Sequence, residues 1–145
     1  MIKQVRDSKT FLDIVDKLDD TDCKLSKKSL YSFMIAGEYN KQTFTYASYN
    51  DTNNDTNNNK MTGCEVITLN NALNGDLTLT VVFLWIDPHY RKLWKNYLKY
   101  TELRALELKC KKISFTTSRS EEAIKRQMGK YGYKKVYNVI EKEMI

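Results

Sequence analysis

Residues 86–98, IDPHYRKLWKNYL, mark the place where an apolar run ends and a basic helix begins. The run before them, LTLTVVFLWI, alternates at first and then becomes continuously apolar, which predicts a strand buried on both faces within a sheet. Asp87-Pro88 interrupts the run, and we expect a helix to begin near His89. The core stripe of this helix recurs at steps of three and four, at Trp94, Leu98, Thr101, Ala105 and Leu108. The stretch therefore predicts a central strand that leads directly into a packed helix.

The N-terminal part has the pattern of a short strand followed by two helices. The strand is expected at residues 2–5, and Asp7 or Ser8 is expected to cap the first helix. The core positions of that helix are Phe11, Ile14, Val15 and Leu18. The second helix is expected around residues 25–34, with Gly37 closing this section. Its inward positions are Leu30, Phe33 and Met34.

Two strands and a long connection follow. TFTYASY (43–49) alternates like a half-buried strand, and CEVITL (64–69) is predicted to be its antiparallel partner. The tract between them, NDTNNDTNNNKMTG, has no apolar periodicity, and we expect a flexible hairpin loop at about residues 50–63. Asn74-Gly75 is a strong turn signal ahead of the apolar run.

The C-terminal part indicates a crossover unit. KKISFTTS (111–118) is expected to be a strand, and Ser120 is expected to cap a helix that extends to Lys130. Gly132 then ends that helix as a left-handed cap, and residues 133–145 form one strand or two short ones. The expected order is β-α-α-β-β-β-α-β-α-β. It predicts a single α/β domain over residues 1–145, with a mixed sheet and helices on both of its faces.

Composition limits the classes of function. The chain has 145 residues, a net charge of +6 and a pI near 9.1, which favours anionic partners such as nucleic acid or polyphosphate cofactors. Three separated cysteines and one histidine give no metal-site spacing, so we expect no metal. No apolar stretch has the roughly 20 residues of a membrane span, and no secretory signal is present. We therefore expect a cytoplasmic protein, or one in a virion assembled in a host cytoplasm.

The start of the basic helix is unusually rich in cations, which are Arg91, Lys92, Lys95 and Lys99. A helix N-terminus carries a partial positive charge, so cations there are unfavourable unless an anion binds nearby. Two interpretations stay open. The cations bind phosphate, or they solvate the exposed face opposite the core stripe.

The whole arrangement resembles the GNAT superfamily of acyl-CoA N-acyltransferases. The phrase at residues 86–91, IDPHYR, is similar to the V-x-P-x-Y-R phrase that ends the central strand in that family, and KYGY (130–133) is similar to its K-x-G-F phrase. The resemblance implies that acetyl-CoA or another acyl-CoA places its pantetheine arm along the central strand, at Val82, Leu84 and Ile86. It also implies a pyrophosphate on the turn after Pro88.

The sequence departs from the family at the phosphate turn and in the last helix. With Arg91 at the first position of the family's phosphate loop, Trp94 and Asn96 stand where two small residues belong. The loop is therefore degenerate, and the side chains of Arg91, Lys92 and Lys95 would bind phosphate in a different way. The family's general acid is a tyrosine four residues before the K-x-G-F glycine, a position that Met128 holds here.

Two residues after the central strand are candidate bases. The family's general base is often a carboxylate on the central strand, which has none here. Asp87 at the strand end is then the only nearby candidate, although Asp-Pro is also a common turn-forming pair. His89, the only histidine, is either a base or a capping and surface residue.

Three functions fit these observations. The first is an acyl-CoA-dependent N-acyltransferase that modifies an amine substrate. The second is a catalytically inactive GNAT-like structural or interaction protein, for example a phage virion or host-interaction protein with a protein assembly partner. The third is a basic nucleic-acid-associated protein.

Overall fold

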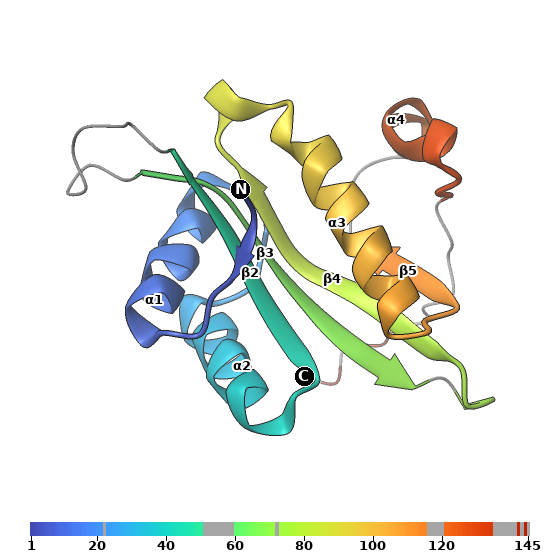
Figure 1. The fold of residues 1–145 in the computed structure, drawn as a ribbon, viewed down its shortest axis with the longest axis horizontal. Helices are drawn as coiled ribbons and strands as arrows, with labels where there is room; N and C mark the ends of the chain where they lie inside the picture. Colours follow the sequence, from blue (N-terminus) through green and yellow to red (C-terminus); the bar gives the residue numbers. More distant parts are fainter. Residues whose placement is uncertain are drawn as a thin grey trace.

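Five strands form one mixed sheet, with helices on both faces (Figure 1). The coordinates are a computed structural model that describes residues 1–21, 23–50, 60–71, 73–115, 121–134, 142 and 144. The strands are β1 (Lys3–Gln4), β2 (Thr43–Asn50), β3 (Lys60–Asn71), β4 (Leu77–Ile86) and β5 (Lys112–Phe115). The α-helices are α1 (Ser8–Asp16), α2 (Lys27–Asn40), α3 (Leu93–Glu107) and α4 (Glu121–Met128). Three short 3₁₀ turns are η1 (Lys17–Asp20), η3 (Pro88–Tyr90) and η4 (Gly129–Tyr131).

The strands follow the order β1-β2-β3-β4-β5, in which every neighbouring pair is antiparallel except β4 and β5. This confirms the predicted mixed sheet and the predicted order of elements as far as α4. The expected final strand at residues 133–145 lies almost entirely outside the described residues, and Tyr133 and Lys134 are not in a strand.

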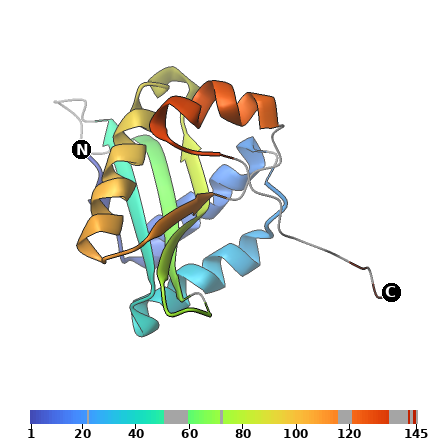
Figure 2. The same cartoon turned by 90° about the vertical axis from the view of Figure 1, so that its right-hand side faces the viewer.

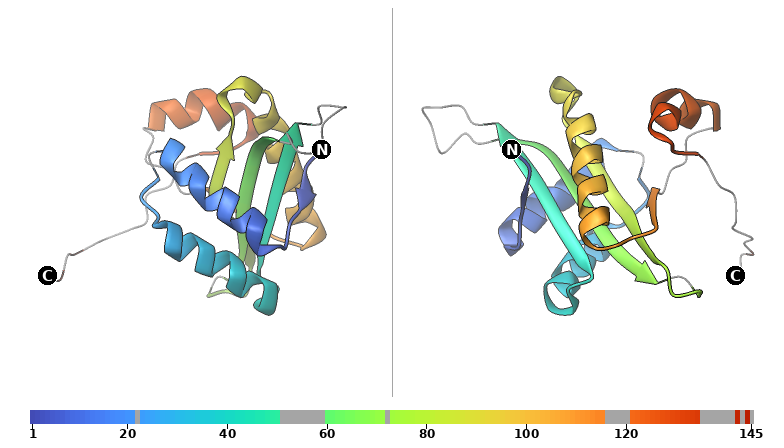
Figure 3. Two further views of the ribbon diagram at one scale, coloured as in Figure 1. Left: turned by 90° about the vertical axis from the view of Figure 1, so that its left-hand side faces the viewer. Right: turned by 45° about the vertical axis from the view of Figure 1, so that its right-hand side comes forward.

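Helices α1 and α2 cover one face of the sheet and α3 covers the other, as Figures 2 and 3 show. Each face carries its own apolar cluster. The cluster under α1 and α2 includes Phe11, Met34 and Trp85, and the cluster under α3 includes Ile67 and Leu79. The central strand therefore contributes to both cores, as its apolar run predicts.

The first helix forms as expected. The second is longer than expected, with Leu30 and Met34 buried as predicted. Asp7 caps α1 by accepting a hydrogen bond from the Thr10 N–H at 2.9 Å. Phe33 is 36% exposed, so its predicted inward position is wrong. Gly37 lies inside α2 rather than closing it. A Cβ at this position would lie 2.5 Å from the Thr43 Cβ, which explains why the position holds glycine. Lys41, at φ 56°, ends the helix instead.

The β2–β3 hairpin is confirmed with different bounds. β3 begins at Lys60, so the last four residues of the expected 50–63 loop belong to the strand, and Asn50 belongs to β2. Residues 51–59 lie outside the described part of the chain. The predicted turn at Asn74-Gly75 is present, with Gly75 at φ 87° and the Asn74 side chain accepting from the Asp76 N–H at 3.0 Å.

The expected helix near His89 begins with η3, and the regular helix α3 starts only at Leu93. Its buried residues are Tyr97, Leu98, Thr101 and Ala105, whereas Trp94 and Leu108 are half-buried. α4 ends at Met128 rather than Lys130, and η4 completes the turn. Gly132 has φ 87° and is the predicted left-handed cap.

Two further properties follow from the described residues. None of their helices is both long and apolar enough to cross a membrane. They also contain no cluster of three His, Cys, Asp or Glu side chains that could hold a metal ion. The three cysteines are free thiols, of which only Cys64 is fully buried.

Candidate active site

Strand β4 carries a β-bulge at Val82. Ile67 pairs with Val81 and Val66 pairs with Phe83, so Val82 has no partner on β3. An extra residue shifts the alternation of side chains between the two faces by one position. Val81 consequently packs in the cluster under α3, whereas Phe83 packs in the cluster under α1 and α2. The change of face explains why the sequence is continuously apolar here.

Beyond this bulge, the outer edge of β4 pairs with none of the described strands. Parallel pairing joins residues 78–81 to Lys112–Phe115. Within the described part of the chain, no strand pairs with the outer edge of residues 82–86. The free N–H and C=O groups of such an edge can bind an extended ligand as they would bind another strand. Leu84 and Ile86 turn half-buried side chains toward the α3 cluster.

A pocket of about 860 Å³ lies at the carboxyl end of this strand. Turn η1, Thr21 after it and the first residue of β3 form one part of its lining, and the end of β4 with η3 forms the rest. Its lining residues are Lys17, Asp20, Thr21, Lys60 and residues 84–89. The Lys17 ammonium lies over the Trp85 ring, 4.7 Å from the ring centroid. The free edge of β4 therefore leads into a hollow that contains both charged and aromatic groups.

Asp87 is the buried carboxylate of this pocket, with a relative exposure of 4%. Its Oδ1 accepts a hydrogen bond from the His89 N–H at 2.9 Å, which caps η3. Its Oδ2 lies 3.6 Å from the Nζ of Lys60. Asp87 thus has the expected turn-forming role through Oδ1, and its Oδ2 faces the Lys60 amine. The His89 side chain is exposed at the rim.

The turn after Pro88 presents cations to solvent. Arg91, Lys92 and Lys95 are exposed, and none of them forms an ion pair with a described carboxylate. Lys92 occupies the N-cap position of α3 and provides no side-chain cap. The first turn of α3 is therefore an unneutralised positive region beside the pocket.

No protein-family model matches the sequence. A search of curated proteins likewise finds no match. Solved structures, however, match along nearly the whole chain. An aminoglycoside 6′-N-acetyltransferase from Acinetobacter haemolyticus has a TM-score of 0.73 at 12% identity and covers 100% of this chain and 98% of its own. A GNAT family acetyltransferase from Staphylococcus aureus has a TM-score of 0.67 at 14% identity, with coverages of 99% and 98%. The chain has the GNAT fold.

A third GNAT-fold neighbour, a transcriptional regulator from Bacillus halodurans, has a TM-score of 0.75 at 15% identity and covers 99% of both chains. At identities this low, the structural matches show a shared fold and nothing more. The chemistry of this chain therefore has to be argued from its own residues.

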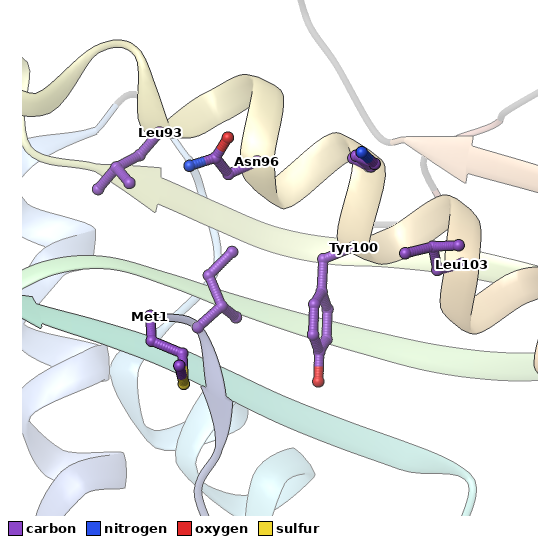
Figure 4. A pocket seen from close by; sticks show the side chains of 7 residues that line it. Met1, Leu93, Asn96, Tyr100 and Leu103 are labelled. Carbon is purple, nitrogen blue, oxygen red and sulfur yellow. The ribbon is translucent and has the colours of Figure 1, made fainter.

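Trp94 and Asn96 lie on different sides of α3. The Trp94 ring packs edge-on against Tyr131 of η4, with ring centroids 5.6 Å apart. Asn96 instead lines a separate groove of about 310 Å³ between α3 and the N-terminus, together with Leu93 and Tyr100 (Figure 4). Of the two, Trp94 is thus the residue that contacts the C-terminal part of the GNAT fold.

The α4 region provides no acid at the position of the family's tyrosine. Met128 is the last residue of α4 and is half-buried. Tyr133 is the nearby phenol with a defined partner, because its hydroxyl donates a hydrogen bond to Glu102 of α3 at 3.1 Å. Burial, together with the Glu102 charge, raises the pKa of Tyr133 well above its usual range. The hydrogen bond therefore joins Tyr133, which follows η4, to α3.

Sequence reasoning missed a buried acid under α3. Glu65 of β3 is fully buried, and the Thr101 hydroxyl lies 2.9 and 2.8 Å from its two carboxyl oxygens. Burial raises the pKa of Glu65 to about 8, although the hydrogen bond with Thr101 lowers it in part. The sequence feature that could have indicated this buried acid is a single charged residue in a mainly apolar strand segment, CEVITL.

Proposed function

We propose that this protein is an acyl-CoA-dependent N-acyltransferase that modifies a primary amine. The observation that carries the proposal is the free edge of β4 at residues 82–86, which begins at the bulge and ends at the pocket around Asp87. In the GNAT fold of this chain, that edge is where an extended, amide-containing donor can pair with backbone groups.

The fit to coenzyme A differs between its two ends. The backbone of Val82, Leu84 and Ile86 suits the pantetheine arm, because no described strand competes for this edge. The turn after Pro88 lacks the small residues that let a backbone approach phosphate, and Trp94 occupies one of those positions. The side chains of Arg91, Lys92 and Lys95 would therefore hold the pyrophosphate.

Two residues of the pocket, Asp87 and His89, are candidate bases in the transfer. The acyl donor supplies a thioester, whose carbonyl is polarised by the backbone N–H groups of β4. Asp87 is the candidate base, but it lies beside the phosphate turn, so the proton of an amine that attacks the thioester would reach its Oδ2 through intervening water. His89 lies at the rim as a second base. Because Met128 has no proton to donate, the departing thiolate takes its proton from water or from Asp87.

Calorimetric titration with acetyl-CoA tests this proposal. A ligand present at about 100 times its dissociation constant stabilises the fold by roughly 2.7 kcal/mol, so a thermal-shift assay provides a second readout. We expect saturable binding and a raised Tm. The absence of both at millimolar acetyl-CoA would contradict an acyl-CoA-dependent enzyme.

One observation favours a second function, a non-catalytic GNAT-fold interaction protein such as a virion component. The contact between Trp94 and Tyr131 joins α3 to η4 across the turn where the coenzyme phosphates would lie. Binding of acetyl-CoA without release of free coenzyme A in the presence of amines would support this function.

The net charge of +6 also suits the third candidate function, binding of nucleic acid. That function requires steeply salt-dependent retention on DNA or RNA.

A further inference from the structure

The edge of β4 that suits an acyl donor accommodates only the donor's pantetheine arm. Residues 82–86 span roughly 13 Å, so an arm whose thioester lies near Val82 has its phosphate at the turn after Pro88. Coenzyme A carries a nucleotide beyond this phosphate. An acyl carrier protein instead joins the same arm, through the same phosphate, to a serine on its surface. The surface beyond the turn therefore determines which of the two donors fits.

A pair of aromatic rings lies beyond the turn. The Trp94 ring of α3 packs edge-on against Tyr131 of η4, with ring centroids 5.6 Å apart. The pocket that contains the end of β4 is lined as far as His89 and includes neither ring. The edge and the pocket that suit the arm thus end where the nucleotide of coenzyme A would begin.

Cations from two elements surround this ring pair. They are Arg91 and Lys92 before α3, Lys95 within it, and Lys130 of η4. All four are exposed, and none forms an ion pair with a described carboxylate. The Lys130 ammonium lies over the Tyr131 ring, 5.2 Å from its centroid, so the cations of η4 and α3 meet at the rings. This surface is complementary to an acidic protein face.

The charge and the free edge together select among anionic partners. A second copy of this chain would place the same cations opposite one another across a two-fold axis. Nucleic acid suits the cations but leaves the edge of residues 82–86, which no described strand pairs with, without a ligand. An acidic carrier protein uses both features, because its surface is anionic and its arm is an extended chain with amide groups.

We propose that the preferred acyl donor is an acidic carrier protein, whose phosphopantetheine arm lies along β4 while its acidic face docks on the cations around Trp94 and Tyr131. The inference rests on the proposed function and names its donor, and acetyl-CoA, which has the same arm, binds more weakly. In the transfer, a neutral amine attacks the thioester carbonyl carbon, and the C–N bond forms as the C–S bond breaks. The proton that the amine loses ends on the carrier's thiolate.

Binding measurements with three ligands test this inference. They are an acidic acyl carrier protein with an acetylated phosphopantetheine arm, the same carrier without its arm, and acetyl-CoA. At about 0.1 M salt, the acetylated carrier should bind at least about tenfold more tightly than either of the others. This advantage over acetyl-CoA should shrink at about 1 M salt, because exposed charges are screened.

The same measurements separate the inference from the proposed function. Acetyl-CoA that binds as tightly as the acetylated carrier would overturn the inference and leave the proposed function standing. A carrier that binds equally well without its arm would also overturn it, because the edge of β4 would then have no part in docking. If neither acetyl-CoA nor the acetylated carrier binds, the proposed function fails as well.

Two charge reversals of equal size locate the docking surface. Lys130→Glu places a carboxylate beside the ring pair and should weaken binding of the acetylated carrier at least about tenfold. Lys112→Glu is the matched control, because Lys112 is exposed and pairs with Thr78 at the amino end of β4. Trp94→Gly should tighten binding of acetyl-CoA alone, so that the preference for the carrier falls. Equal effects of the two reversals would contradict the proposed docking surface.

Discussion

The hydroxyl oxygen of Thr101 on α3 lies 2.9 and 2.8 Å from the two carboxyl oxygens of Glu65 on β3, in a part of the core that solvent does not reach. The same oxygen lies 2.8 Å from the Tyr97 carbonyl oxygen. A hydroxyl has one proton and cannot donate it to all three. A neutral Glu65 satisfies every group, because it donates to Thr101 while Thr101 donates to the carbonyl.

The protonated state of Glu65 predicts a pH dependence of stability. Its folded pKa is about 8, above the ordinary value of 4.5, so the folded protein binds an additional proton between these limits. The stabilisation is fully present below about pH 4.5 and is lost as the pH rises through about 8. Glu65→Gln should therefore gain stability relative to the native chain from pH 5 to pH 9, by a few kcal/mol at most.

Urea denaturation of both proteins at pH 5, 7 and 9 measures this difference. Glu107→Gln is a matched control, because Glu107 is an exposed partner of Arg104 on the same helix. Parallel stability curves for the native chain and Glu65→Gln would mean that Glu65 is ionised in the folded protein.

Gly37 predicts an exception to ordinary helix propensity. Alanine normally stabilises a helix interior by about 1 kcal/mol relative to glycine. At this position the added Cβ would lie 2.5 Å from the Thr43 Cβ and 3.0 Å from the Thr43 carbonyl oxygen. Gly37→Ala should therefore destabilise the protein by about 1–3 kcal/mol in chemical denaturation. Thr43→Gly should lower the cost of Gly37→Ala in a double-mutant cycle, and a gain in stability from Gly37→Ala alone would refute the close approach.

The cations beside the pocket predict which residues bind phosphate. Arg91→Ala and Lys95→Ala should each weaken acetyl-CoA binding about tenfold, which corresponds to roughly 1.4 kcal/mol. Both effects should shrink at high salt, because the side chains are exposed. Lys99→Ala is the matched control, since Lys99 lines the groove on the other side of α3 and should leave the Kd unchanged. Equal effects at all three positions would indicate general electrostatic attraction without a phosphate site.

Trp94 is predicted to restrict the phosphate turn. Trp94→Gly removes the edge-on ring contact with Tyr131 and places glycine in the first turn of α3, so it should cost about 2 kcal/mol of stability. The same change should tighten acetyl-CoA binding, because it restores a small residue at that position. Tyr131→Ala is the control, since it removes the ring contact while the Trp94 side chain remains in the turn. A loss of stability with no gain in affinity would make Trp94 a packing residue only.

Local patterns in the sequence predicted most of the fold. The Asp7 cap, the Asn74-Gly75 turn and the Gly132 cap each depend on a few adjacent residues, and all three are present. The exposure of Phe33 and the place of Gly37 within α2 were missed, because they depend on how that helix meets β2.

The site was harder to predict than the fold, because its contacts join distant segments. Lys60 and Asp87 meet only through the pairing of β3 with β4, and Lys60 follows an Asn-rich tract that carries no strand signal. Glu65 and Thr101 meet only when α3 packs on the sheet. The bulge at Val82 is equally non-local, since it is defined by the register with β3.

Hydrogen exchange along β4 tests directly whether the free edge of this strand binds the acyl donor. The backbone amides of residues 82–86 should exchange more slowly when saturating acetyl-CoA is present, because an extended donor would pair with this edge. The amides of β2 should be unaffected, because β1 and β3 already flank that strand. Unchanged exchange at residues 82–86 under saturating acetyl-CoA would mean that the donor does not pair with this edge.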